Sequence, residues 1–313
     1  MRKSAKASAP GKFHLIGEHS SVYGKPVLLC AIDDRITISI KLAKDTDLSV
    51  LDESGQQAVK AIQQFIQKKY KLKDIRYAIK INSQLSVGRG LGSSAAFSSA
   101  VAAALFHLYG LKFNLTEIFE AAYAGEKAFH GNPSGGDLAV CVFGGLLWFR
   151  KETENIKLFK KLEVLSPIIR KVILVDSGKP VETTKKMVEM VANKNLLDES
   201  LVFKFNEQQE ALVKILSDAL IKNNSENVLT SIKKAERNLE VLGVVGEKAQ
   251  KMIRKLEKNG DVAKISGGGG VKNGSGIMVV FCKNKKKTIT FCRENKWEYM
   301  PVKISEEGVR IEK

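Results

Sequence analysis

The sequence has few of the features that mark secreted, zinc-binding or membrane-spanning proteins. Four cysteines occur among its 313 residues, at irregular spacings within apolar stretches: Cys30, Cys141, Cys282 and Cys292. Such cysteines are typical of reduced thiols in a core and not of disulfides or a zinc site. No apolar run approaches the length of a membrane span, about 18 residues, and the first residues lack the apolar segment of a secretory signal. We therefore expect a cytoplasmic protein with no membrane partner.

Several catalytic motifs are missing as well. There is no G-x-x-x-x-G-K-[ST] P-loop, no H-R-D or D-F-G signature of protein kinases, and no G-x-S-x-G elbow of serine hydrolases. The chain also has no H-E-x-x-H motif or Cys/His pairing, so a catalytic zinc is not expected. The residues that carry the function must therefore lie in other patterns.

Positive charge is in excess, with 51 lysines and arginines against 34 aspartates and glutamates, a formal net charge of +17. The lysines are spread along amphipathic helical patterns and are not gathered with aromatic residues in a nucleic-acid-binding motif. No nucleic-acid partner is therefore expected. A basic surface does attract anionic small molecules such as ATP and carboxylates.

The chain is long enough for two domains with separate cores. We place them at residues 1–160 and 161–313, with the charged segment 151–161 as the seam between them. Mixed helix and strand patterns predict an α+β protein with two sheets, each covered by helices.

Local patterns predict several individual elements. Strands are expected at 27–32 and 35–42, joined by a hairpin turn at residues 33–34. The two apolar runs within 138–149 predict two strands or one kinked strand, and residues 225–257 predict one helix.

The most informative stretch is Gly88–Phe97, which reads Gly-Arg-Gly-Leu-Gly-Ser-Ser-Ala-Ala-Phe. Three glycines at alternate positions free the backbone and leave no side chains to block a close ligand. A helix follows over Ser94–Tyr109, with Gly110 as its end. A glycine loop at a helix N-terminus presents free N–H groups and the positive end of the helix dipole, which suit a phosphate group. A tight turn before a buried helix is the structural alternative.

Charged residues near other turns supply the remaining parts of a phosphoryl transfer. That reaction needs a phosphate cradle, a divalent cation, a cation at the transferred group and a carboxylate for the attacking hydroxyl. The candidates are Gly88–Ser94 as the cradle, Ser94 and Glu126 as ligands of Mg²⁺, Lys12 as the cation and Asp137 as the carboxylate. A hydroxyl and one carboxylate are sufficient for Mg²⁺ beside ATP, because this ion keeps most of its waters.

Taken singly, these residues have plainer interpretations. Glu126 also fits a solvent-facing position on a helix, Asp137 a turn cap, and His19 a polar residue of a loop. We interpret His14 and His107 as structural residues.

Three segments in order along the chain resemble the motifs of the GHMP kinases, the superfamily of galactokinase and the homoserine, mevalonate and phosphomevalonate kinases. These segments are 9–24, Gly88–Ala96 and Lys264–Gly270. The resemblance implies a two-domain α+β fold, with a first domain like domain 2 of ribosomal protein S5 and a ferredoxin-like C-terminal domain. It also implies that ATP and the acceptor bind in the cleft between them.

Within the superfamily, the segment His130–Asp137 is most similar to the HGxPSGxD segment of mevalonate kinases. The resemblance implies that Asp137 is the catalytic carboxylate with Lys12 beside it, and that Ser94 and Glu126 hold Mg²⁺. The implied ATP-binding residues are Gly88, Arg89, Gly90, Leu91, Gly92, Ser93, Ser94 and Ala95. Those implied or expected on the substrate side are Glu18, His19, Gly267, Gly268 and Thr183.

The expected activity is ATP-dependent phosphorylation of the primary hydroxyl of mevalonate, by a monomer or homodimer. The sequence departs from the family pattern at Ser86, where proline is frequent, at Gly136, where an apolar residue is usual, and at 271–274, which interrupt the third motif. The alternatives are the same chemistry on phosphomevalonate or a sugar, and a non-catalytic protein that binds a nucleotide or polyanion.

Overall fold

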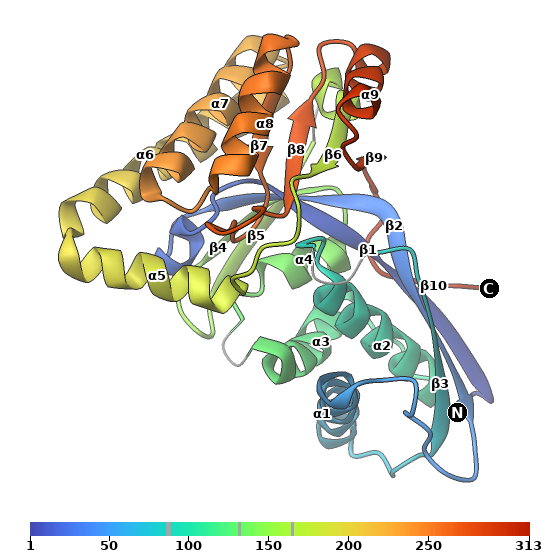
Figure 1. Cartoon of the computed structure of the whole chain (residues 1–313). Helices are drawn as coiled ribbons and strands as arrows, with labels where there is room; N and C mark the ends of the chain where they lie inside the picture. Colours follow the sequence, from blue (N-terminus) through green and yellow to red (C-terminus); the bar gives the residue numbers. More distant parts are fainter. Residues whose placement is uncertain (86–88, 131–132, 164–165) are drawn as a thin grey trace.

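Two antiparallel sheets organise the chain in the computed structural model, which describes residues 1–85, 89–130, 133–163 and 166–313 (Figure 1). The first sheet has six strands in the order β10-β1-β2-β4-β5, with β3 paired to β2, and the second has four in the order β7-β8-β6-β9. The predicted α+β class with two sheets is confirmed.

The first sheet is built mainly from the first half of the chain. Its strands are β1 (Ser4–Ile16), β2 (Val27–Leu42), β3 (Tyr77–Ser83), β4 (Leu146–Lys151), β5 (Lys157–Leu162) and β10 (Arg310–Ile311). Its helices are α1 (Glu53–Tyr70), α2 (Ser93–Tyr109), α3 (Leu115–His130) and α4 (Gly136–Phe143), and a short 3₁₀ helix covers Ser20–Tyr23. Nearly all of α2 is buried, including its alanines. Helix α3 begins with a reciprocal cap between Asn114 and Glu117,.

The second sheet comes from the later part of the chain. Its strands are β6 (Val172–Asp176), β7 (Val262–Ile265), β8 (Ile277–Phe281) and β9 (Tyr299–Pro301). Its helices are α5 (Thr184–Leu197), α6 (Glu199–Ile221), α7 (Ser225–Leu242), α8 (Glu247–Lys258) and α9 (Lys285–Glu294), with a 3₁₀ turn at Pro167–Lys171. Figure 1 shows α6, α7 and α8 grouped beside β7 and β8, and α5 extending from that group below them.

The predicted hairpin turn at residues 33–34 is wrong, because these residues lie inside one continuous strand, β2. The pairing with β1 passes from Pro10–Arg35 directly to Gly11–Ile32, so Asp33 and Asp34 form a bulge. The backbone N–H of Asp33 donates to Lys303 O at 3.0 Å, so the distant C-terminal segment satisfies it. A bulge of this kind bends the strand and redirects the side chains that follow.

Two further local predictions are wrong. The first apolar run of 138–149 forms helix α4, and only the second forms a strand, β4. The run is buried on every side, so it carries no periodicity that separates a helix from a strand. The single helix predicted at 225–257 is divided in two, because Gly243 ends α7 in the left-handed conformation (φ 80°),.

The charged segment 151–161 is not a plain linker, because it includes most of β5, which pairs with β4 as an edge strand of the first sheet. The domain boundary at residue 160 stays a prediction. It falls within β5, and the final strand β10 returns to pair with β1. The four cysteines are buried and free, as predicted. No helix within the described ranges has the length and apolar character needed to cross a bilayer.

A buried ion pair joins the two sheets. The ammonium of Lys264, on β7, donates to Glu18, which follows β1, and both residues are almost completely buried. A second contact lies at the surface, where Arg89 pairs with Asp176 at the end of β6 and with Glu298 at 2.8 Å.

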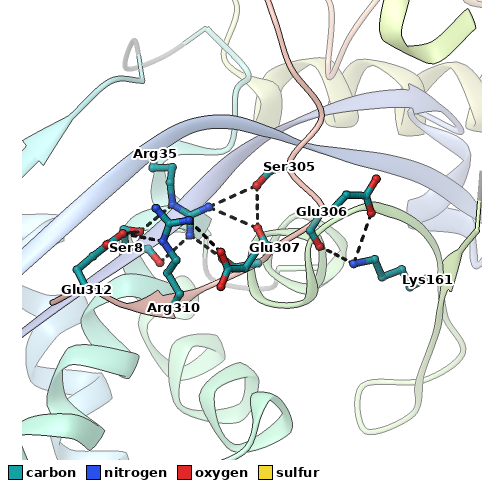
Figure 2. A network of polar contacts seen from close by, with 9 residues as sticks. Ser8, Arg35, Lys161, Ser305, Glu306, Glu307, Arg310 and Glu312 are labelled. Carbon is teal, nitrogen blue, oxygen red and sulfur yellow. Dashed lines mark hydrogen bonds and ion pairs between the residues drawn. The ribbon is translucent and has the colours of Figure 1, made fainter. Parts of the chain in front are cut away.

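The C-terminal segment is held by a second polar network, centred on the buried guanidinium of Arg35 (Figure 2). Arg35 donates to Ser8 Oγ at 2.7 Å and to the carbonyl oxygen of Gly308 at 2.6 Å. The same segment contacts α4, since Val309 N donates to Val142 O at 3.1 Å. Arg35 thus holds the C-terminal segment against β1 and β2, and the same segment contacts the C-terminal end of α4.

We predict that Arg35→Met lowers the free energy of unfolding by about 3 kcal/mol or more, because several buried acceptors lose their donor at about 1–3 kcal/mol each. Urea unfolding followed by circular dichroism measures this change. The control is Arg76→Met, which removes an exposed pair with Asp45 and should cost less than about 1 kcal/mol. Equal effects of the two substitutions would contradict the assigned role of Arg35.

We predict that Lys264→Met destabilises the protein by about 3–5 kcal/mol, because it leaves the Glu18 carboxylate buried without a cation. The double variant Glu18→Leu/Lys264→Met should regain most of this loss, since neither charge then remains buried. Lys251→Met is the control, because its pair with Glu247 is exposed. A double variant no more stable than Lys264→Met alone would argue against the pairing.

Candidate active site

An ion pair between Lys12 and Asp137 forms the centre of the site. Lys12 lies on β1 just after the bulge, Asp137 lies in the first turn of α4, and Lys12 Nζ is 2.9 Å from Asp137 Oδ2. The lysine is 2% exposed, whereas the aspartate side chain is 40% exposed. Burial alone would raise the pKa of Asp137, but Lys12, with the nearby histidines, holds it below its ordinary value,. The site therefore pairs a buried ammonium group with a carboxylate that stays ionised and is partly exposed to solvent.

The glycine loop lies directly against Lys12. The backbone N–H of Lys12 donates to Leu91 O at 2.9 Å. Gly92 is in the left-handed conformation (φ 72°), and a Cβ there would lie 2.7 Å from Lys12 Cγ. Only glycine satisfies both conditions. A Cβ on Gly90 would lie 3.5 Å from Ser266 O, so the loop also reaches the third motif.

The helix predicted after the loop is confirmed, with α2 beginning at Ser93 and ending at Gly110. The N-cap residue is Gly92, which has no side chain to cap the helix, so the first N–H groups of α2 stay available to an anion. Ser93, Ser94 and Ala95 form this first turn. Gly88 lies outside the described residues, as does the departure at Ser86.

Ser94 and Glu126 come together as predicted. Ser94 Oγ is 3.5 Å from Glu126 Oε2 and 3.0 Å from His130 Nε2, and Ser98 Oγ donates to Glu126 Oε1 at 3.1 Å. Glu126 is only 3% exposed, so its interpretation as a solvent-facing helix residue is wrong. Burial, with the charge of Asp137, raises the pKa of Glu126 to about 7.

A hard divalent cation fits this pair of oxygen ligands. A hydroxyl and a buried carboxylate are the donors that Mg²⁺ prefers, and a cation there would offset the cost of burying the Glu126 charge. No group of three or more histidine, cysteine, aspartate or glutamate side chains that could hold a metal occurs in the described part of the chain.

His14 belongs to this site, so its interpretation as a structural residue is wrong. Its Nδ1 is 3.1 Å from Lys12 Nζ and its Nε2 is 3.4 Å from Asp137 Oδ1. The signal was present in the sequence, since alternate residues of a strand share one face and Lys12 and His14 are two apart. His107, the other histidine set aside, lies on α2.

The residues predicted on the substrate side lie around the third motif. His19 Nε2 is 3.0 Å from Gly268 O. Glu18 lies deeper, against Lys264. Glu18 Oε2 and His19 Nδ1 are buried and have no hydrogen-bond partner among the described residues, an arrangement that a bound polar ligand or water would relieve.

Gly267 and Thr183 are each next in sequence to a residue of this region, Gly268 and Thr184, and those two residues lie close together. A Cβ on Gly267 would meet open space, and one on Gly268 would lie 3.2 Å from Thr184 Cγ2. Thr183 is the N-cap of α5 and accepts from Lys186 N at 3.3 Å, so its hydroxyl already serves the helix.

The glycine beside the catalytic candidate is closely packed. A Cβ on Gly136 would lie 3.1 Å from Phe149 Cδ1 and 3.2 Å from Leu29 Cδ1. These two side chains fill the space that an apolar residue would occupy, so the missing side chain leaves no gap next to Asp137.

Comparison with known proteins gives matches over the whole chain. A family model for the N-terminal domain of GHMP kinases matches residues 56–145, and one for the galactose-binding signature of galactokinase matches residues 2–42. The mevalonate kinase of Archaeoglobus fulgidus is 31% identical, covering 98% of this chain and 99% of the relative. That of Pyrococcus furiosus is 28% identical, covering 98% of each.

The solved structures agree on the fold. The crystal structure of L. major mevalonate kinase in complex with R-mevalonate matches with a TM-score of 0.77 at 20% identity, covering 95% of this chain and 93% of that one. This likeness confirms the predicted GHMP kinase fold. With a relative above 30% identity aligned over almost its entire length, the chain belongs to the mevalonate kinase family, within the GHMP kinases.

Proposed function

We propose that this protein transfers the γ-phosphoryl group of ATP to the primary hydroxyl of mevalonate. The observation that carries the proposal is the Lys12–Asp137 pair, which lies directly against a glycine loop at a helix N-terminus. The names of the full-length relatives support mevalonate as the acceptor.

Asp137 is the group that handles the acceptor hydroxyl. Its carboxylate orients the hydroxyl toward the phosphorus atom and accepts its proton as the new bond forms. The adjacent Lys12 ammonium keeps Asp137 ionised and stabilises negative charge on the transferred group. Because phosphoryl transfer passes through a loose transition state, positioning contributes more than proton removal.

The triphosphate binds at the glycine loop and the first turn of α2. The residues we assign to it are Gly88, Arg89, Gly90, Leu91, Gly92, Ser93, Ser94 and Ala95. Backbone N–H groups and the helix dipole supply the attraction for phosphate oxygens. Arg89 pairs with Asp176 and Glu298, so its side chain also connects the loop to the second sheet.

Mg²⁺ would be held by Ser94 Oγ and the Glu126 carboxylate. When bound, the ion would offset the negative charge of the ATP phosphates. The chain's own contribution is a buried carboxylate fixed by Ser98 and a hydroxyl on the first turn of α2.

Mevalonate would lie between the Asp137 carboxylate and the cluster of Glu18, His19, Gly267, Gly268 and Thr183. His19 Nδ1, which has no partner in the described part of the chain, supports this assignment, because a buried polar atom without a partner is costly unless a ligand or water satisfies it,. Thr183 contributes through its position, since its hydroxyl caps α5.

The second candidate is a sugar kinase, favoured by the match of the galactokinase signature to residues 2–42. The expected result of an acceptor panel is ATP-dependent ADP release with mevalonate and none above background with galactose, homoserine or phosphomevalonate. A coupled assay with equal concentrations of each acceptor measures it. Turnover with galactose and with no other acceptor would indicate a sugar kinase. No turnover with any alcohol would favour a non-catalytic nucleotide-binding protein.

We predict that Asp137→Asn lowers kcat about 10²–10⁴-fold, because the amide cannot accept the hydroxyl proton, while the dissociation constant for ATP changes little. Steady-state kinetics and isothermal titration with a non-hydrolysable ATP analogue measure the two quantities. Asp218→Asn is the control, because Asp218 lies exposed on α6 and pairs only with Lys222 among the contacts described for it. Wild-type turnover in Asp137→Asn would remove this residue from its role.

A further inference from the structure

His14 contacts both members of the Lys12–Asp137 pair. Its ring is held between them, with Nδ1 3.1 Å from Lys12 Nζ and Nε2 3.4 Å from Asp137 Oδ1. Lys12 meanwhile contacts the other carboxylate oxygen, Oδ2, at 2.9 Å. Each oxygen of Asp137 therefore has its own nitrogen neighbour, and the three side chains form a closed ring of contacts.

The contacts decide the protonation of the imidazole ring. An ammonium group can only donate, so His14 Nδ1 must accept from Lys12 and carry no proton. The single proton of the neutral ring then lies on Nε2, where it faces Asp137 Oδ1. With Nδ1 occupied, the ring has no lone pair left to take a proton from Asp137, which argues against His14 as the base.

The surroundings favour this neutral ring. The charged groups that face His14 are Lys12 on its own strand, Asp137 on α4, Glu18 after β1 and Lys264 on β7. Burial and the adjacent Lys12 together lower the pKa of His14 to about 4. The backbone N–H of His14 donates to Ser266 Oγ at 2.8 Å, which fixes this part of β1 to the third motif.

We propose that His14 is a positioning residue for phosphoryl transfer: its neutral ring bridges Lys12 and Asp137 and holds the carboxylate in one orientation. This inference rests on the proposed function. Lys12 alone binds one oxygen and leaves the carboxylate free to rotate about its Cβ–Cγ bond. The Nε2–H contact on the second oxygen removes that freedom, and the remaining lone pairs stay directed to the exposed side where an alcohol would enter.

The expected effect of losing the bridge is a fall in kcat with little change in KM. In His14→Leu, we expect kcat to fall about 10- to 100-fold, because a misplaced reacting group costs this much without weakening binding. The acid limb of the kcat profile should also move to higher pH, since Asp137 loses a donor that favours its ionised form. His14→Gln should recover most of the activity, because its amide N–H can reach the same carboxylate oxygen.

The matched control is His107→Leu, the same substitution on α2, which should leave kcat and the acid limb unchanged. Thermal unfolding of all three variants separates positioning from folding. Equal losses of kcat in His14→Leu and His14→Gln that follow their losses of thermal stability would overturn the proposal. So would wild-type kcat and an unmoved acid limb in His14→Leu.

A second measurement does not depend on the acceptor. With only four histidines in the chain, long-range ¹H–¹⁵N spectra assigned through His14→Gln should give an unprotonated Nδ1 and a protonated Nε2 for His14 at pH 7. A proton on Nδ1, or a doubly protonated ring, would overturn the bridge. If the wild-type protein phosphorylates none of the alcohols offered, the proposed function fails, and the tautomer measurement still decides whether the bridge exists.

Discussion

The burial of one ammonium group constrains the whole site. Lys12 is almost inaccessible to water, and a buried charge is tolerated only when it is paired and hydrogen-bonded. Asp137 supplies the counter-charge from α4, His14 supplies an acceptor from the same strand, and Gly92 supplies the space for the lysine stem. The side chain of Lys12 therefore contacts strand, helix and glycine loop. A shift of α4 would separate its charge from Asp137, and a side chain at position 92 would clash with its stem.

The bulge in the β1–β2 ribbon sets the direction of this lysine. Pro10 pairs with Arg35 and Gly11 with Ile32, so the extra residues Asp33 and Asp34 lie between these two pairs, and Lys12 follows immediately. The C-terminal segment stabilises the bulge, because Lys303 O accepts the hydrogen bond of Asp33 N–H. Arg35 holds the same segment through its hydrogen bond to Gly308 O (Figure 2). The last residues of the chain thus support the first catalytic candidate, although almost 300 residues separate them.

The two sheets meet through polar contacts that converge on the third motif. Glu18 pairs with Lys264, His19 contacts Gly268, and the backbone of His14 contacts Ser266. Each contact joins β1, or the residues directly after it, to β7 or the residues directly after β7. The glycine loop, through Gly90, and the substrate-side residue His19 consequently lie beside the same segment, the third motif.

The sequence alone determined the parts of this protein that depend on local chemistry. Glycines at alternate positions before an alanine-rich helix predict a loop and a helix N-terminus, and three motifs in order predict the GHMP kinase family. The pairing of Asn114 with Glu117 and the free cysteines also follow from nearby residues. The helix start, the cap and each single motif are set by neighbours within a few positions, whereas the family assignment comes from the order of three motifs along the chain.

Only the tertiary structure decided what distant residues do to each other. A fully buried apolar run has no hydrophobic periodicity, so the strand prediction for α4 is wrong. The turn predicted at residues 33–34 is a bulge, whose Asp33 N–H donates to the distant Lys303 O. His14 belongs to the site because it contacts Asp137, 123 positions away in the sequence. Lys264 is the buried partner of Glu18. Burial and pairing are properties of the folded surroundings, and no pattern of adjacent residues contains them.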